Sequence, residues 1–260
     1  MRNSFVVASL GLALFGCRSS TNNNPDSPNG SDGSNAGTVT IQMIQDPGMA
    51  AGTQVAVAGV VVTAIDNFGG TVGNFWIEEP EGGPNSGVLV YHGDAATVAM
   101  LNPGDIISLS GAVKDEFALT GSNAYPTGRT DVELEPVAGG TMTITKTGTG
   151  SVPAPAVVDA LMYGQMSDAD AQGPNFSAAW KQWDGVLVTM TNVAAGGAPK
   201  AFGKTMPTPA DDYSFSITGV AKVEGSLSDI TMSGIARNTC LSSVTGIVDY
   251  FYDYLVLPRT

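Results

Sequence analysis

The chain has 260 residues, enough for one or two domains, and its formal net charge at pH 7 is −13. Lysine and arginine together number 11 against 24 aspartates and glutamates, a balance that repels nucleic acid, whose binding needs clustered cations. Only 13% of the residues are charged while glycine occupies 33 positions, which argues against a disordered or helix-rich chain and favours an all-β protein.

Residues 1–16 have the form of a lipoprotein signal peptide. Arg2 gives a positive start, and the apolar run from Phe5 to Phe15 is too short to span a bilayer as a helix. The run ends in Leu14-Phe15-Gly16-Cys17, which resembles the bacterial lipobox. That resemblance implies that Cys17 becomes the lipidated first residue, and the arginine after it resembles the sorting pattern of outer-membrane lipoproteins. An ordinary signal peptide with an incidental cysteine is the alternative.

Residues 17–38 predict a disordered tether between this anchor and the folded part. They are rich in asparagine, glycine, serine, aspartate and proline, which cannot bury enough apolar surface to pack. A random coil of this length spans about 25 Å on average and would lift the folded part away from the lipid headgroups.

A short β-rich element occurs twice in the remainder of the chain and divides it into two repeats, residues 39–148 and residues 149–260. Gly59-Val60-Val61-Val62-Thr63 returns as Gly185-Val186-Leu187-Val188-Thr189, and a second glycine-led stretch follows each copy. Repeats of this size indicate tandem small barrels. A glycine inside a long strand lets the strand bend and serve both sides of such a barrel.

The first repeat predicts a series of short strands separated by Gly-Pro and Pro-Gly turns. Residues 39–44 are expected to form an edge strand, and residues 55–65 a long bent strand. The later strands are expected at 75–79, 87–92 and 106–113, with 131–135 and 141–146 as the closing edge.

The motif order of this repeat resembles the OB-fold module that accompanies secreted bacterial nucleases and related lipoproteins. It runs from the bent strand through Gly73-Asn74-Phe75-Trp76-Ile77-Glu78 to Leu101-Asn102-Pro103-Gly104-Asp105 and the strand after it. The resemblance implies a five-stranded Greek-key barrel. It does not imply nuclease activity, because in such proteins the chemistry lies in a separate phosphoesterase domain.

The second repeat is expected to form a similar barrel behind a short helical connector. Val157, Val158 and Leu161 have helical spacing. Strands are expected at 213–217 and 221–223, with 241–257 as a hairpin or one long strand. The predicted fold is therefore all-β: two tandem OB-like five-stranded Greek-key barrels with one or two short helices, preceded by a signal peptide and a disordered tether.

The residue types of the chain predict no catalytic constellation, no metal site and no cofactor. His92 is the one histidine, and no nucleophile motif accompanies it. Cys240 is the one cysteine left once Cys17 carries lipid, so neither a cysteine zinc site nor an intramolecular disulfide is then available, and its thiol is expected to be buried and inert. The acidic clusters lack EF-hand spacing and are interpreted as a solvated rim, with calcium at one of them as the alternative. They lie at 78–81, 168–170, 211–212 and 249–253.

Aromatic side chains are the candidate ligand contacts. In OB barrels the ligand face is usually formed by the second and third strands with their loops. In the second repeat, alternating tyrosines would share one face of a strand. Exposed, these aromatics would suit sugar rings or a protein partner, and buried they would be ordinary packing. The candidate ligand-binding residues are Trp76, Tyr91, His92, Tyr125, Tyr250, Tyr252 and Tyr254.

The function that the sequence favours is that of a non-catalytic lipoprotein anchored in the outer membrane, whose modules bind a protein or a glycan or act structurally. The alternative is an accessory module for extracellular nucleic-acid processing, which the family resemblance suggests and the negative charge opposes. A hydrolase without a recognisable motif is a weaker alternative. Ligand identity, membrane face and oligomeric state are left open.

Overall fold

A computed structural model describes residues 37–66, 68, 73–91, 95–117, 131–159, 178–201, 213–217, 221–231, 233–251 and 253–259. The predicted signal peptide with Cys17 and nearly all of the tether lie outside these ranges, as do His92, Tyr125 and Tyr252. Residues 36–260 belong to one compact unit. None of the helices in the described ranges is long and apolar enough to cross a membrane.

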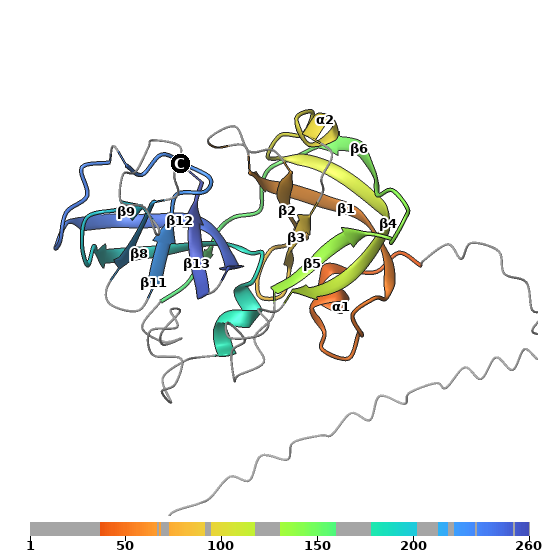
Figure 1. Cartoon of the computed structure of the whole chain (residues 1–260), viewed down its shortest axis with the longest axis horizontal. Helices are drawn as coiled ribbons and strands as arrows, with labels where there is room; N and C mark the ends of the chain where they lie inside the picture. The colour runs from red at the N-terminus through yellow and green to blue at the C-terminus, as the bar shows by residue number, and fades with distance from the viewer. Residues whose placement is uncertain are drawn as a thin grey trace, which may run out of the picture. The chain divides into compact units, whose positions relative to one another are not determined.

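Five strands of the first repeat close into a mixed β-barrel (Figure 1), called here the barrel. The sheet order is β1-β2-β3-β5-β4, and β4 returns to pair with β1. All of these neighbours are antiparallel except β3 and β5, which are parallel. The strands of the barrel are β1 (Gln54–Ile65), β2 (Asn74–Glu78), β3 (Gly87–Tyr91), β4 (Asp105–Phe117) and β5 (Asp131–Pro136). A sixth strand, β6 (Thr143–Thr149), pairs with the first half of β4, from Asp105 to Ser110.

The long first strand bends as its sequence predicts. Gly59 has φ +76°, a left-handed conformation that side-chain-bearing residues rarely adopt. β1 pairs with β4 from Gln54 to Val61 and with β2 from Val61 to Ile65, so one strand serves two neighbours. The predicted closing strand at 131–135 is not an edge, since β5 lies between β3 and β4.

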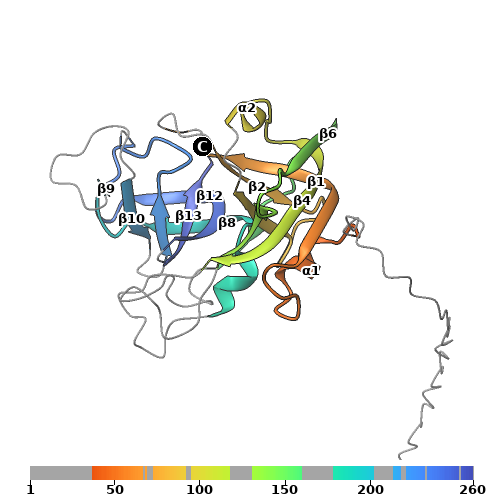
Figure 2. The same ribbon diagram turned by 45° about the vertical axis from the view of Figure 1, so that its right-hand side comes forward.

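The predicted edge strand at 39–44 is wrong, because these residues lead into the helix α1 (Ile41–Gln45). Thr40 caps the helix by accepting a hydrogen bond from Met43 N at 3.3 Å. Ile41 and Ile44 are three residues apart and both fully buried in the barrel core, which explains why helical spacing prevails over strand propensity. In Figure 1 and Figure 2 the helix lies at the lower end of the barrel.

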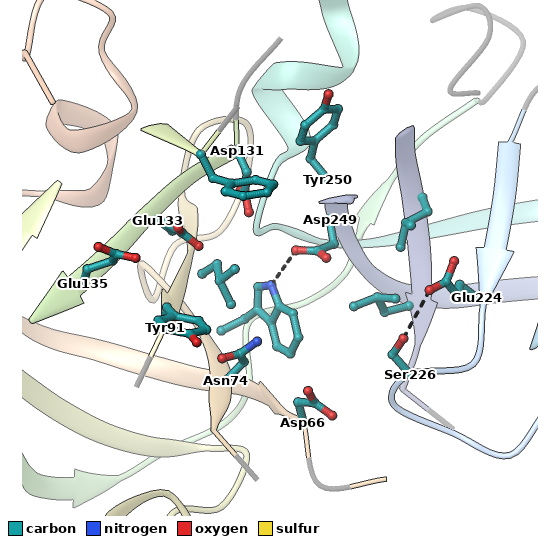
Figure 3. A pocket seen from close by; sticks show the side chains of 15 residues that line it. Asp66, Asn74, Tyr91, Asp131, Glu133, Glu135, Glu224, Ser226, Asp249 and Tyr250 are labelled. Atoms are coloured by element: carbon teal, nitrogen blue, oxygen red, sulfur yellow. Dashed lines mark hydrogen bonds between the residues drawn. The ribbon is translucent and has the colours of Figure 1, made fainter. Parts of the chain in front are cut away.

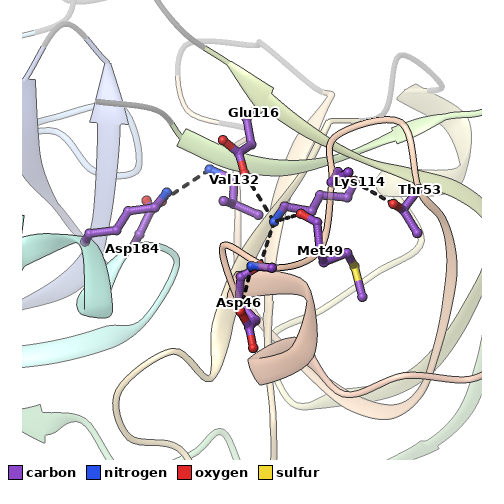
Figure 4. Close-up of polar contacts among 10 residues, drawn as sticks. Asp46, Met49, Thr53, Lys114, Glu116, Val132 and Asp184 are labelled. Atoms are coloured by element: carbon purple, nitrogen blue, oxygen red, sulfur yellow. Dashed lines mark hydrogen bonds and ion pairs between the residues drawn. The ribbon is translucent and has the colours of Figure 1, made fainter. Parts of the chain in front are cut away.

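Buried Lys114 on β4 attaches the loop after α1 to the barrel (Figure 4). Its Nζ donates to the carbonyl oxygens of Asp46 at 3.1 Å and Met49 at 2.7 Å, and it pairs with Glu116 at 3.2 Å. These acceptors satisfy a charge that would otherwise be costly to bury. A short helix, α2 (Ala95–Val98), follows β3.

The described strands of the second repeat form an open sheet of seven strands, here the second sheet, instead of the closed barrel that the sequence predicts. The order is β7-β8-β12-β13-β11-β10-β9, and one isolated bridge joins Ala195, after β8, to Ile217 of β10. The strands are β7 (Ala156–Val157), β8 (Leu187–Ala194), β9 (Lys200–Ala201), β10 (Tyr213–Ile217), β11 (Ala221–Glu224), β12 (Cys240–Phe251) and β13 (Asp253–Pro258), with a 3₁₀ helix at Ala178–Trp183.

Two predictions for this repeat have clear outcomes. Val157 lies in a short strand paired with β8, so the expected helix does not include it. Of the two alternatives for residues 241–257, a hairpin or one long strand, the structure has the hairpin, because β12 and β13 pair from Gly246 to Pro258.

The barrel and the second sheet share an apolar cluster in addition to their separate cores. Its members are Ala64, Trp76 and Leu89 from the barrel with Leu187, Ile247, Leu255 and Leu257 from the second sheet. Close backbone packing accompanies it, because a Cβ on Gly87 would overlap the carbonyl group of Gly185. Leu187 N donates to Glu78 Oε2 at 3.2 Å and Asn85 N to Gln182 O at 2.6 Å. We call this contact region the joint.

Candidate functional site

A pocket of about 430 Å³ opens beside the joint, between the barrel and the second sheet (Figure 3). Its wall combines aromatic rings and leucines with more carboxylates than small-molecule sites usually have. The lining residues are Asp66, Asn74, Trp76, Leu89, Tyr91, Phe117, Asp131, Glu133, Glu135, Glu224, Ser226, Asp249, Tyr250, Leu255 and Leu257.

One strand of the barrel supplies half of the carboxylates. Side chains alternate along a strand, so Asp131, Glu133 and Glu135 of β5 share the face that lines the pocket. Val132 and Leu134 point the other way, into the barrel core. We call Asp131, Glu133 and Glu135 the β5 acid row.

The acid row has a fourth carboxylate beside it. Asp115 of β4 is the direct cross-strand partner of Glu133. One carboxylate oxygen from each of Asp115, Glu133 and Glu135 lies within 4.8 Å of the others. The two glutamates also line the pocket, which places this oxygen cluster on the pocket wall.

Burial and mutual repulsion both favour protonation of the row. Burial, followed by the charges of Glu135, Asp115 and Asp184, raises the pKa of Glu133 from 4.5 to about 7. Burial and then the charges of Asp184 and Asp249 raise the pKa of Asp131 well above its ordinary value. The pocket therefore holds exchangeable protons close to neutral pH.

Asp249 faces the row from the second sheet, at the end of a hydrogen bond that crosses the joint. Trp76 Nε1 donates to Asp249 Oδ1 at 3.1 Å. Burial and the neighbouring charge of Asp184 raise the pKa of Asp249 to about 7, against the opposing effect of that hydrogen bond. The hydrogen bond fixes the position of the indole nitrogen, which can only donate.

Two lysines near the pocket in the described part of the chain already have partners. Lys181 pairs with Asp184 at 2.8 Å, and Asp184 also accepts from Val132 N at 3.3 Å (Figure 4). Lys222 pairs with Glu224 at 2.9 Å. Within the described ranges, Asp115 and the β5 acid row have no ion-pair partner.

Three of the seven predicted ligand contacts line this pocket. Tyr91 is half exposed, whereas Trp76 and Tyr250 are buried apart from the surface they turn to the pocket. Tyr254 lies in the core of the second sheet instead. The other three candidates lie outside the described residues.

The tyrosines of the last hairpin do not share one face of a single strand as predicted. Tyr250 on β12 is the cross-strand partner of Tyr254 on β13, and their ring centroids are 5.2 Å apart. The turn between the strands makes them neighbours across a hairpin, where such aromatic pairs stabilise a sheet. Cys240 also differs from its prediction, since it begins β12 and is exposed.

The sequence interpretation missed the β5 acid row, although a signal for it is present. Asp131-Val132-Glu133-Leu134-Glu135 alternates acidic and apolar residues, which predicts a strand with one wholly acidic face. Such a face is ordinarily solvated. The alternation does not predict that the second sheet covers this face and makes it a pocket wall.

No protein-family model matches the chain, and no curated protein is significantly similar to it. The pocket therefore has to be interpreted from its own chemistry. What stands without analogy is a mostly β protein with one closed five-stranded barrel, a second open sheet and an acidic, aromatic pocket between them.

Proposed function

We propose that this protein is a non-catalytic binding protein, anchored in the outer membrane through lipidated Cys17, whose pocket binds a glycan that is neutral or carries an amine. The observation that carries the proposal is the composition of the pocket wall, where a half-exposed tyrosine stands beside a row of carboxylates. The predicted tether would give the pocket reach from the membrane surface.

The chemistry of the wall suits a sugar ring. Tyr91 and partly exposed Phe117 offer aromatic surface for the apolar face of a ring. Carboxylates accept hydrogen bonds from hydroxyl or ammonium groups, and Asn74 can both donate and accept. A pocket volume of about 430 Å³ is within the usual range for small-molecule sites.

We propose further that each half is an OB-like module and that the chain contains a tandem pair. The barrel order β1-β4-β5-β3-β2 has its counterpart in β8-β12-β13-β11-β10 of the second sheet. The parallel pairs correspond as well, because β3 is parallel to β5 in the barrel and β11 is parallel to β13 in the second sheet. The bridge from Ala195 to Ile217 lies where β8 would meet β10 to close a second barrel. OB folds bind oligosaccharides as well as oligonucleotides.

A hydrolase is the second candidate, favoured by one observation. The pKa of Glu133 near 7 would let it hold a proton at neutral pH, as the general acid of a glycosidase does, with other carboxylates close by. Incubation with bound glycans separates the two readings, because a binding protein leaves them intact and a glycosidase releases a reducing end.

Calorimetric titration of the mature protein with neutral, amine-bearing and acidic oligosaccharides tests the proposal. We expect binding of the first two classes and none of the acidic class, which the carboxylates repel. Tyr91→Ala should weaken binding about tenfold, the loss of one aromatic contact. Met43→Ala is the matched control, because Met43 on α1 is as exposed as Tyr91 and outside the pocket.

Binding of acidic glycans alone, or of a protein partner at a surface unaffected by Tyr91→Ala, would overturn the glycan proposal. The anchor is tested separately by Cys17→Ser, which should move the protein from the membrane fraction to the soluble fraction. Unchanged membrane association of that variant would contradict lipidation.

A further inference from the structure

The oxygen cluster on the pocket wall brings three carboxylate groups close together. Asp115 and Glu133 are direct cross-strand partners, and like charges in that position destabilise a sheet. Glu135 brings a third carboxylate oxygen within 4.8 Å of both. None of the three has an ion-pair partner among the described residues, so no cation in that part of the chain balances the repulsion.

A second observation, independent of that cluster, also points to a missing partner. Asp131 is only 3% exposed, it lines the pocket, and its Oδ1 has no hydrogen-bond partner in the described part of the chain. A buried carboxylate oxygen without a donor is costly, and such groups are rare unless a ligand or ion satisfies them. Asp131 belongs to the same β5 acid row and is the next residue on that face of the strand before Glu133.

We propose that Asp115, Glu133 and Glu135 bind a divalent cation of the calcium type on the wall of the pocket that Asp131 also lines. Two oxygens bound to one calcium at about 2.4 Å can lie no more than about 4.8 Å apart, and the three oxygens meet that limit. The remaining coordination positions face the pocket, where water or a ligand hydroxyl can fill them.

The donor set favours calcium over other divalent metals. All three donors are carboxylates, the hard oxygen ligands that calcium and magnesium prefer, and neither histidine nor cysteine is among them. Magnesium demands near-ideal octahedral geometry at shorter distances, whereas calcium accepts the irregular arrangement that two adjacent strands present. The site also lies on the paired strands of a closed barrel, which hold the oxygens in place without the ion.

Calcium titration of the mature protein at pH 7.5, followed by calorimetry and by thermal unfolding, tests this proposal without any glycan. We expect saturable binding of one calcium ion and a melting temperature that rises with calcium concentration. Magnesium and zinc at the same concentrations should give a smaller response. Glu133→Gln and Asp115→Asn should each weaken calcium binding at least tenfold.

The variants also separate binding from folding. Because each removes a like-charge contact, Glu133→Gln and Asp115→Asn should melt at or above the wild-type temperature in calcium-free buffer while losing the calcium response. Glu81→Gln is the matched control, since Glu81 is exposed and lies outside the pocket, and it should keep the full response. No calcium response in the wild type, or a full response in Glu133→Gln, would overturn the proposal. Calcium binding without glycan binding would leave this site intact and refute only the proposed function.

Discussion

At the scale of single residues, Glu78 shows how the joint changes an ordinary acidic residue. Its side chain is fully buried and accepts from Leu187 N at 3.2 Å across the joint. The Ser86 hydroxyl donates toward Glu78 Oε1 at 3.0 Å and toward Gly83 O at 2.5 Å, although it has a single hydrogen. Burial raises the pKa of Glu78 from 4.5 to about 7, which the two hydrogen bonds only partly oppose. A proton on Glu78 would leave the serine hydrogen free for Gly83.

We predict that Glu78 makes folding less favourable as the pH rises from about 4.5 to about 7. The folded state holds the proton more tightly than the unfolded chain, so the free energy of unfolding falls in this window and this residue contributes no further change above it. Glu78→Gln, which mimics the protonated form, should gain about 2 to 3 kcal/mol relative to wild type between pH 5 and pH 8. Urea unfolding at both pH values measures this difference.

The control for Glu78→Gln is Ser86→Ala, which removes a hydrogen-bond partner and keeps the titrating carboxyl group. It should lower the free energy of unfolding at both pH values and retain the pH dependence. If Glu78→Gln followed the wild-type profile in parallel, the pKa of Glu78 would not be raised as the structure indicates.

At the scale of elements, the start of β3 and the residues before β8 are joined by glycine packing. Gly87 and Gly185 are in backbone contact, and Gly185 has φ +73°. Gly185 was predicted to bend the second long strand as Gly59 bends the first, but β8 begins only at Leu187. Gly185 therefore allows the barrel and the second sheet to approach each other closely.

We predict that Gly87→Ala destabilises the joint by about 1 to 3 kcal/mol, because the new methyl group would overlap the carbonyl group of Gly185 and force the backbones apart. Thermal unfolding measures the effect, which should appear as a lower melting temperature. Gly197→Ala is the matched control, since nothing lies within 4 Å of a Cβ at that position, and it should be neutral or slightly stabilising. Equal melting temperatures for the two variants would contradict the close packing.

At the scale of the whole molecule, charge and the shared core decide what the protein can do. The net charge is −13, and the pocket adds a concentration of carboxylates at the place where an OB-like module would bind its ligand. Single-stranded nucleic acid binds OB folds through aromatic platforms inside a positively charged groove. Tyr91 and Phe117 provide aromatic surface here, but the groove around them is acidic.

We predict no binding of single- or double-stranded DNA at physiological salt, with any dissociation constant weaker than about 10⁻⁴ M. Fluorescence anisotropy with labelled oligonucleotides tests this in metal-free buffer and again with calcium, because a bound cation can reverse the local charge. Micromolar binding in the metal-free buffer would instead favour the accessory role in nucleic-acid processing.

Several strands of the barrel could be predicted from the sequence, because a strand produces a local pattern of alternating apolar and polar residues. Alternation, glycine position and turn residues predict the long bent strand and the strand containing Trp76. The error at residues 39–44 has a tertiary cause. Residues 39–44 have high strand propensity, and only the burial of Ile41 and Ile44 under the barrel makes helical spacing the better solution.

The sequence by itself determined the β-rich class, the two copies of a glycine-led sequence element and the acidic charge, since each depends on composition or on short-range order. The tertiary structure alone decided that the second sheet stays open, that Tyr250 meets Tyr254 across a hairpin and that Trp76 reaches Asp249. The candidate site belongs to this second class. The pKa values of Asp131 and Glu133 on β5 and of Asp249 on β12 are raised because these side chains are buried where segments far apart in the chain meet. The sequence pattern predicts the acidic face of β5 but not the second sheet that covers it. Only that cover removes the water that would otherwise keep the carboxylate pKa values at their usual level.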